Sequence, residues 1–252
     1  MIEIFILSLI QGITEFLPVS STSHLIIVSE YLNFENNELK IDVSLHIGSF
    51  FAVVVFFRKD VFDFLQNKDL FLKIFLGSLP VMIIGYILVK FDLIYQIRNI
   101  KVIGWTTLIF GLLLYISDRS DIFKNIRKDF TFKSVIFIGF FQVLSLIPGV
   151  SRSGISITGA RILKFNRYDA AKISFLLSIP TLAAVSVFGV YNLVESENLS
   201  FSFLNIFSIV FSFIISYVTI KYFLRYIKKF SLNIFFIYRV ILGIGLLILA
   251  YL

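Results

Sequence analysis

Residues 11–25 read QGITEFLPVSSTSHL, a polar stretch set in a sequence that is apolar on both sides. The stretch holds a carboxylate, a proline, five hydroxyl groups and a histidine within fifteen positions. Proline removes a backbone donor and clashes with the preceding turn, so a helix that enters this stretch is expected to break near Pro18. The stretch therefore predicts two short helical halves with a polar break between them.

The whole chain has the composition of an integral membrane protein. Its 252 residues are 58% hydrophobic, include 31 Phe and give a mean hydropathy of +0.93, whereas soluble domains are roughly 45–50% apolar. Apolar runs close to the ~20 residues that cross a bilayer recur along its length. The absence of Cys excludes disulfides and Cys-bound metals. The start, MIEIFILSLIQG, lacks the features of a signal peptide and is interpreted as part of the mature protein.

Charge places the loops on two sides of the membrane. The formal charge is +7, but the basic residues gather in short loops, as the positive-inside rule describes, so no nucleic-acid partner is expected. Residues 118–133 and 221–229 are basic and are expected inside. Residues 30–42 and 194–202 are acidic and are expected outside, together with both termini. The loop at 90–101 is net basic although this threading places it outside.

Six segments are expected to cross the membrane as helices, and two further segments are expected to be re-entrant hairpins. The hairpins, 1–32 and 134–164, each contain an apolar half, a Pro- and Ser-rich break and a second apolar half. Each half is too short to cross alone, and irregular backbone at membrane depth must be buried in protein or face a wet cavity. The expected spans are 41–57, 71–89, 101–117, 172–192, 203–221 and 232–252.

The two halves of the chain resemble each other when residues are shifted so that Gln11 aligns with Gln142 and Ser20 with Ser151. Each hairpin precedes three spans, an odd number that inverts the second copy. The predicted fold is an all-α integral membrane protein with about six transmembrane helices plus two re-entrant helix hairpins in an inverted repeat. We expect a single membrane domain, 1–252, whose halves at about 1–117 and 134–252 are joined by a basic cytoplasmic loop, 118–133. Such repeats place a polar site where the broken helices meet.

The polar side chains of the two breaks suit an oxyanion with several oxygens, of which phosphate is the natural example. An ionisable group in lipid costs at least ~2.5–3.5 kcal/mol, so Glu15, His24 and Arg152 are expected to share one polar cavity. Helix N-termini after each break attract anions, and arginine offers a planar fork to phosphate. The candidate phosphate-binding residues are Ser20, Thr22, Ser151, Arg152, Ser153 and Ser156.

Each of these residues also has a structural interpretation. Ser and Thr in membrane helices often bond the i−4 carbonyl or join neighbouring helices. Glu15 and Arg152 can form a purely structural ion pair, and His24 can be a packing residue. His46, inside the first expected span, is interpreted as a structural residue.

At QGITEFLPVSSTSHL and LIPGVSRSGISITGARIL the sequence resembles the undecaprenyl-diphosphatase family, also called bacitracin-resistance proteins. The resemblance extends over essentially the whole chain, including HIGSFFAVVVFFRKD and SFLLSIP. It implies a hydrolase of the bacterial plasma membrane that converts undecaprenyl diphosphate to undecaprenyl phosphate and inorganic phosphate, and so recycles the lipid carrier of peptidoglycan and cell-wall synthesis. The resemblance also implies dependence on a divalent cation, Mg or Ca, and an active site that opens to the outer face.

Carried over residue by residue, the resemblance implies that Glu15, Ser21, His24 and Arg152 are catalytic. Glu15 would be the metal ligand, with Gln11 as a second candidate. The family's first acidic position, which can be Glu, is Gln11 here, and an amide is a weaker ligand that cannot act as a base. The nucleophile stays open between Ser21, His24 and water.

A transporter or flippase of undecaprenyl phosphate is the alternative function, because inverted repeats with broken helices also occur in transporters. The nucleophile-like hydroxyls beside acidic and basic partners favour an enzyme. The expected partners are the undecaprenyl diphosphate substrate and membrane lipids. A homodimer remains open, since no exposed motif indicates one.

Overall fold

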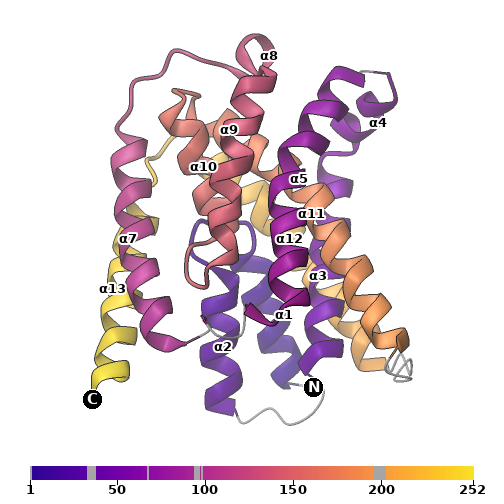
Figure 1. Ribbon diagram of the computed structural model, residues 1–252, viewed down its shortest axis with the longest axis vertical. Coiled ribbons are helices and arrows are strands. Elements are labelled where there is room, and N and C mark those ends of the chain that lie inside the picture. Colours follow the sequence, from indigo (N-terminus) through magenta and orange to yellow (C-terminus); the bar gives the residue numbers. More distant parts are fainter. Residues whose placement is uncertain (1, 33–37, 67, 94–96, 98, 196–202) are drawn as a thin grey trace.

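The computed structural model describes residues 2–32, 38–66, 68–93, 97, 99–195 and 203–252. Side chains at 22, 26, 29–32, 38–40, 63–66 and 195 lie outside this description. The described chain is built from α-helices joined by short loops (Figure 1). The helices are α1 (Ile2–Thr14), α2 (Ser21–Leu32), α3 (Glu38–Phe56), α4 (Arg58–Gln66), α5 (Lys68–Lys90), α7 (Ile100–Asp118), α8 (Ile126–Asp129), α9 (Phe132–Val143), α10 (Arg152–Ile162), α11 (Arg167–Glu195), α12 (Phe203–Ile227) and α13 (Asn233–Tyr251).

Helix lengths confirm the prediction of an all-α membrane protein. Within the described residues, α5, α7, α11, α12 and α13 are long and apolar enough to cross a bilayer. The sixth expected span is α3, whose apolar part, Ile41–Phe56, is shorter, because Glu38, Lys40 and Asp42 make its beginning polar. The short amphipathic α4 was not predicted as a separate helix.

Both predicted hairpins are broken helices, α1–α2 and α9–α10. Figure 1 shows their bends near the middle of the molecule, reached from opposite ends. A 3₁₀ turn at Leu144–Leu146 leads into the second bend. Ser20 and Ser151 close the two bends with φ of 82° and 73°, a left-handed conformation that is uncommon for non-glycine residues. These two serines align with each other in the internal repeat of the sequence. The same positive-φ conformation therefore ends the bend in both halves.

Helix pairing follows the same internal symmetry. The first half of one hairpin, α1, packs on α12, and its counterpart α9 packs on α5. Likewise α3 packs on α12, and α11 packs on α5. The crossing of α5 and α9 is close, because a Cβ on Gly139 would lie 2.2 Å from the carbonyl oxygen of Gly77. The two halves are therefore interleaved, with each hairpin packed against a helix of the opposite half.

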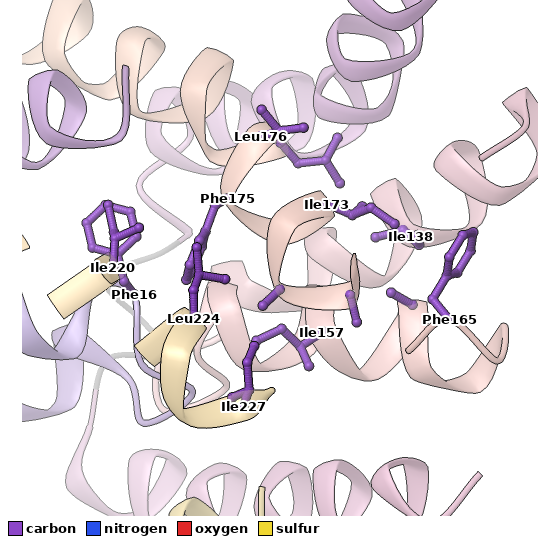
Figure 2. Close-up of a cluster of buried hydrophobic side chains, with 14 of the residues drawn as sticks. Phe16, Ile138, Ile157, Phe165, Ile173, Phe175, Leu176, Ile220, Leu224 and Ile227 are labelled. Atoms are coloured by element: carbon purple, nitrogen blue, oxygen red, sulfur yellow. The ribbon is translucent and has the colours of Figure 1, made fainter. Parts of the chain in front are cut away.

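A buried apolar cluster supports the bends from one side. Phe16, in the first bend, is fully buried and packs edge-on against Phe175 of α11 with ring centroids 5.3 Å apart. Figure 2 shows Phe16 and Phe175 close to Ile220 and Leu224 of α12, with Ile157 of α10 in the same cluster. The irregular first bend is thus anchored by an aromatic side chain in the protein interior.

The helix ends agree with the sidedness expected from charge. The end of α2, the start of α3 and the ends of α11 and α13 lie at one end of the molecule, and α5 points toward the same end (Figure 1). The end of α7 and helices α4 and α8 lie at the opposite end. Much of the acidic loops at 30–42 and 194–202 falls outside the described residues, but the helices that flank them reach the same end.

Candidate active site

A cavity of about 490 Å³ lies where the two bends meet α3, α5 and α11. One part of its wall is polar and belongs to the bends and to α3, and the other part is apolar. The polar lining includes Glu15, Ser20, Ser21, His46, Ser151 and Arg152. The apolar lining comes mostly from the second halves of α5 and α11 and includes Val81, Met82, Tyr86, Val89, Leu182, Val185 and Phe188. The cavity can therefore accept a molecule with a charged head and a long apolar tail.

Glu15 is the centre of the polar wall. Arg152, from the opposite hairpin, donates from Nη2 to Glu15 Oε1 at 2.5 Å. Ser21 Oγ donates to Glu15 Oε2 at 2.8 Å, and Gln11 Nε2 donates to the same oxygen at 3.1 Å. Glu15 is nearly buried, with its side chain 7% exposed. The predicted meeting of Glu15 and Arg152 across the two hairpins is therefore observed.

Arg152 and the serines beside it lie at helix N-termini. Ser21 and Arg152 are the first residues of α2 and α10, where unpaired backbone N–H groups and the helix dipole favour anions. Arg152 Nε and Nη1 have no hydrogen-bond partner among the described residues, so both can donate to a bound oxyanion. Ser151 caps α10 by accepting from the backbone N–H of Gly154 at 3.2 Å. The left-handed backbone of Ser20 and Ser151 is the type of strain that clusters at functional sites.

His24 lies outside this group. Its Nδ1 is 2.6 Å from the carbonyl oxygen of Ser20, which can only accept, so Nδ1 carries the proton and the lone pair is on Nε2. The hydroxyl of Tyr238 lies 2.5 Å from Nε2 and donates to it, and the two rings are stacked. His24 is not among the residues that line the cavity. The expected sharing of one cavity by His24, Glu15 and Arg152 therefore differs from the structure, because Tyr238 of α13 holds the ring elsewhere.

Two of the predicted phosphate-binding serines contact protein instead of the cavity. Ser153 Oγ donates to the carbonyl oxygen of Leu17 at 2.7 Å, which joins the second hairpin to the first bend. Ser156 is fully buried and lies 3.5 Å from Gln142 Oε1. Neither serine lines the cavity, whereas both were predicted to bind phosphate there. Ser153 Oγ is also 3.3 Å from Ser151 Oγ, which belongs to the cavity wall. The side chain of Thr22 lies outside the described residues, although its backbone belongs to α2.

Arg239 of α13 braces both bends and was missed by the sequence analysis. Its fully buried guanidinium donates to the carbonyl oxygens of Gly149 at 2.9 Å and Val150 at 3.0 Å in the second bend. It also reaches Pro18 O of the first bend at 3.4 Å and Thr107 O of α7 at 3.1 Å. A charged residue within an apolar span is itself a signal of function or of buried polar structure, and this signal at Arg239 was available in the sequence.

The residues at the cavity fit a hard cation only in part. Among the described residues no three His, Asp or Glu side chains come together in a way that could hold a metal ion. Gln11 is buried behind Glu15 and is not among the residues that line the cavity; its Nε2 donates to Glu15, and its Oε1 has no hydrogen-bond partner. Mg²⁺ commonly takes one or two carboxylates together with substrate phosphates, so Glu15 and Gln11 fit a site that a diphosphate would complete.

The fold and the cavity define a class of protein: a multi-pass membrane protein whose two inverted broken helices hold a charged site for an amphiphilic oxyanion. The sequence model of the bacitracin resistance protein BacA family matches residues 4–245. The chain belongs to this family.

Proteins of known name resemble the chain over nearly its full length. The undecaprenyl-diphosphatase of Pelagibacter ubique is 49% identical over 99% of this chain and 98% of its own. The undecaprenyl-diphosphatase of Hahella chejuensis is 39% identical over 99% of this chain and 98% of its own. That of Jannaschia sp. is 37% identical, with 98% of each chain covered. The family recognised from the two motifs is thereby confirmed.

Proposed function

We propose that this protein is an undecaprenyl-diphosphatase, which hydrolyses undecaprenyl diphosphate to undecaprenyl phosphate and inorganic phosphate. The similar proteins carry this name, and the cavity has the two surfaces that such a substrate needs. The observation that carries the proposal is the contact of Ser21, Glu15 and Arg152 at the polar end of an otherwise apolar cavity. In a cell this reaction recycles the lipid carrier for cell-wall synthesis.

The diphosphate lies at the polar end, and the prenyl chain follows the apolar wall. Arg152 holds the terminal phosphate through its free Nε and Nη1 donors, and backbone N–H groups at the starts of α2 and α10 add further donors. The prenyl chain contacts Val185 and Phe188 of α11 and Tyr86 and Val89 of α5. The part of the chain that the cavity does not hold leaves between helices into the lipid.

Ser21 is the nucleophile that this geometry favours. Its hydroxyl already donates to Glu15 Oε2, so the carboxylate is placed to take the proton as Oγ attacks. The Oγ–P bond forms to the terminal phosphorus, the bridging P–O bond breaks, and undecaprenyl phosphate leaves. His24 is less suited to attack, because its lone pair already accepts from Tyr238. Activation of a water molecule by Glu15 is the alternative. Attack by water would leave no phosphate bound to the protein, whereas attack by Ser21 would.

Glu15 and Gln11 would hold a divalent cation, Mg or Ca, when the substrate is bound. The cation supplies neutralisation of the phosphate charge, which is the main requirement of phosphoryl transfer. The protein's own contribution is to orient the terminal phosphate with Arg152 and to keep Ser21 and Glu15 in contact. We further propose that the enzyme lies in the bacterial plasma membrane with its cavity open to the outer face.

The first prediction concerns Glu15 and the cation. Purified protein in detergent should release phosphate from C55 diphosphate, and Glu15→Gln should lower the rate by at least about 10²-fold, because general base catalysis contributes roughly 10²–10⁴. EDTA should abolish release, and added Mg²⁺ or Ca²⁺ should restore it. Phosphate release is measured by a colorimetric assay. Detergent micelles have no second compartment, so transport cannot account for the released phosphate.

Glu3→Gln is the matched control, because Glu3 is exposed on α1 and far from the bend in the chain. It should keep the wild-type rate. A Glu15→Gln variant with a normal rate would remove Glu15 from the mechanism. Wild-type protein that releases no phosphate would favour the flippase alternative, which a vesicle assay for movement of undecaprenyl phosphate can then test.

A further inference from the structure

His46 of α3 lies at the cavity although neither bend contains it. It lines the cavity together with Glu15, Ser21 and Arg152, and its side chain is 19% exposed. In the sequence, His46 lies within an expected span and outside both motifs, which indicated a structural residue. Its position at the polar wall gives the cavity an ionisable group that the mechanism above does not use.

The backbone that carries His46 is fixed tightly to α12. Ser212 Oγ donates to the carbonyl oxygen of Leu45 at 2.7 Å, and Ser49 Oγ lies 3.0 Å from Ser216 Oγ. A Cβ on Gly48 would lie 2.4 Å from the carbonyl oxygen of Ile209, so the two helices touch at this level. A side chain on such a rigid element keeps its place, as precise chemistry requires.

Hydrogen bonding leaves His46 with a lone pair directed away from its own helix. Nδ1 lies 2.8 Å from the carbonyl oxygen of Asp42, which can only accept, so Nδ1 carries the proton in the neutral ring. The lone pair is then on Nε2, which has no partner among the described residues. His24 has the same tautomer, but its Nε2 is occupied by Tyr238. Of these two histidines, His46 is therefore the one that is free to accept a proton.

A carboxylate lies beside the protonated nitrogen of the His46 ring. The Asp42 carboxylate is 3.6 Å from Nδ1, and the ring lines the cavity that also contains Ser21 and Arg152. A histidine with a carboxylate beside one nitrogen and an unpaired second nitrogen at a cavity wall has the arrangement of a general base.

The reaction needs such a base in its second half. After Ser21 has attacked, Glu15 holds the serine proton and cannot also deprotonate the water that must release the phosphate. We propose that His46 is the base of this hydrolytic step, an inference that rests on the proposed function. The water O–P bond forms, the P–Oγ bond of Ser21 breaks, the water proton goes to His46 Nε2, and Ser21 takes its proton back from Glu15. His46 then returns its proton to water in the cavity.

A rapid-quench experiment in detergent tests this assignment, with C55 diphosphate labelled in the terminal phosphate. His46→Gln should release about one equivalent of undecaprenyl phosphate per enzyme in a burst and then release phosphate about 10²–10⁴-fold more slowly than the wild type. The label should accumulate on the protein and should be absent when Ser21→Ala is added to His46→Gln. Val55→Ala, at an exposed position of the same helix, is the control and should keep the wild-type time course within about twofold.

A second variant separates loss of the base from loss of packing. His46→Ala with added imidazole should regain phosphate release while the burst of undecaprenyl phosphate stays unchanged. Normal turnover in His46→Gln, or slowing of both products without a burst, would overturn the role of His46. If the wild type hydrolyses the diphosphate, either of these two outcomes for His46→Gln would remove the role of His46 and leave the proposed function intact. If the wild type releases no phosphate, the proposed function itself fails.

Discussion

Glu15 is the sole carboxylate of its motif, because the first acidic position is the amide Gln11. Its Oε1 pairs with Arg152, and its Oε2 accepts from Ser21 and Gln11. Gln11 cannot be a base, so it supports Glu15 as a donor and leaves its own oxygen free. Because Gln11 cannot accept the proton of a second step, the proposed mechanism assigns that step to His46.

Arg239 should contribute to stability, because it donates to carbonyl oxygens of both bends. Arg239→Met should lower the free energy of unfolding by about 1–3 kcal/mol, as leaving a buried acceptor unpaired does, because buried carbonyl oxygens of Gly149 and Val150 would lose their donor. Arg239→Lys should lose less, since one ammonium can still reach some of these oxygens. Thermal unfolding in detergent measures both variants. Equal melting temperatures for Arg239→Met and the wild type would show that the bends hold their shape without this residue.

At the scale of helices, close contacts between glycines decide how the halves fit together. Gly139→Ala should destabilise the protein by roughly 1–3 kcal/mol, the usual effect of overpacking, because the added carbon would meet the backbone of Gly77 on α5 at 2.2 Å. Gly245→Ala on α13 is the matched control, since no atom lies within 4 Å of its added carbon. Alanine favours a helix over glycine, so Gly245→Ala should melt at the wild-type temperature or above it.

The enzymatic activity of Gly139→Ala and Gly245→Ala should change in the same direction as their stability, because α5 lines the cavity and α9 leads into the second bend. Phosphate release by Gly139→Ala should therefore fall, whereas Gly245→Ala should match the wild type. A Gly139→Ala variant as stable and active as Gly245→Ala would show that α5 and α9 can separate without disturbing the site.

Elements and local motifs were predictable from sequence, whereas contacts between distant helices were not. Both broken helices followed from Pro18 and Pro148 within polar stretches, and the meeting of Glu15 with Arg152 followed from the repeat. The separation of His24 from the cavity depends on Tyr238, which is more than two hundred residues away and belongs to no motif. The position of His46 at the cavity could not be predicted from the sequence, because it is set by how α3 packs on α12.

On the scale of the whole molecule, the cavity lies nearer the end where both chain termini are found. Its lining on α5 runs from Val81 to Val89, and on α11 from Thr181 to Phe188, in both cases in the second half of the helix. The acidic stretch 194–202 follows α11, although the stretch 90–101 that follows α5 is net basic. The basic loops 118–133 and 221–229 lie at the opposite end. The positive-inside rule therefore predicts that the cavity opens outward.

Single cysteines can test this orientation cleanly, because the chain contains no native Cys. Val89→Cys, at the cavity wall, should react with a membrane-impermeant maleimide in intact cells. Lys229→Cys, exposed after α12 at the opposite end, should react only after the cells are lysed. Labelling is read on gels after purification, and both variants should react fully in lysed cells. The reverse pattern would place the cavity toward the cytoplasm, and the lipid diphosphate would then have to reach the enzyme from the inner leaflet.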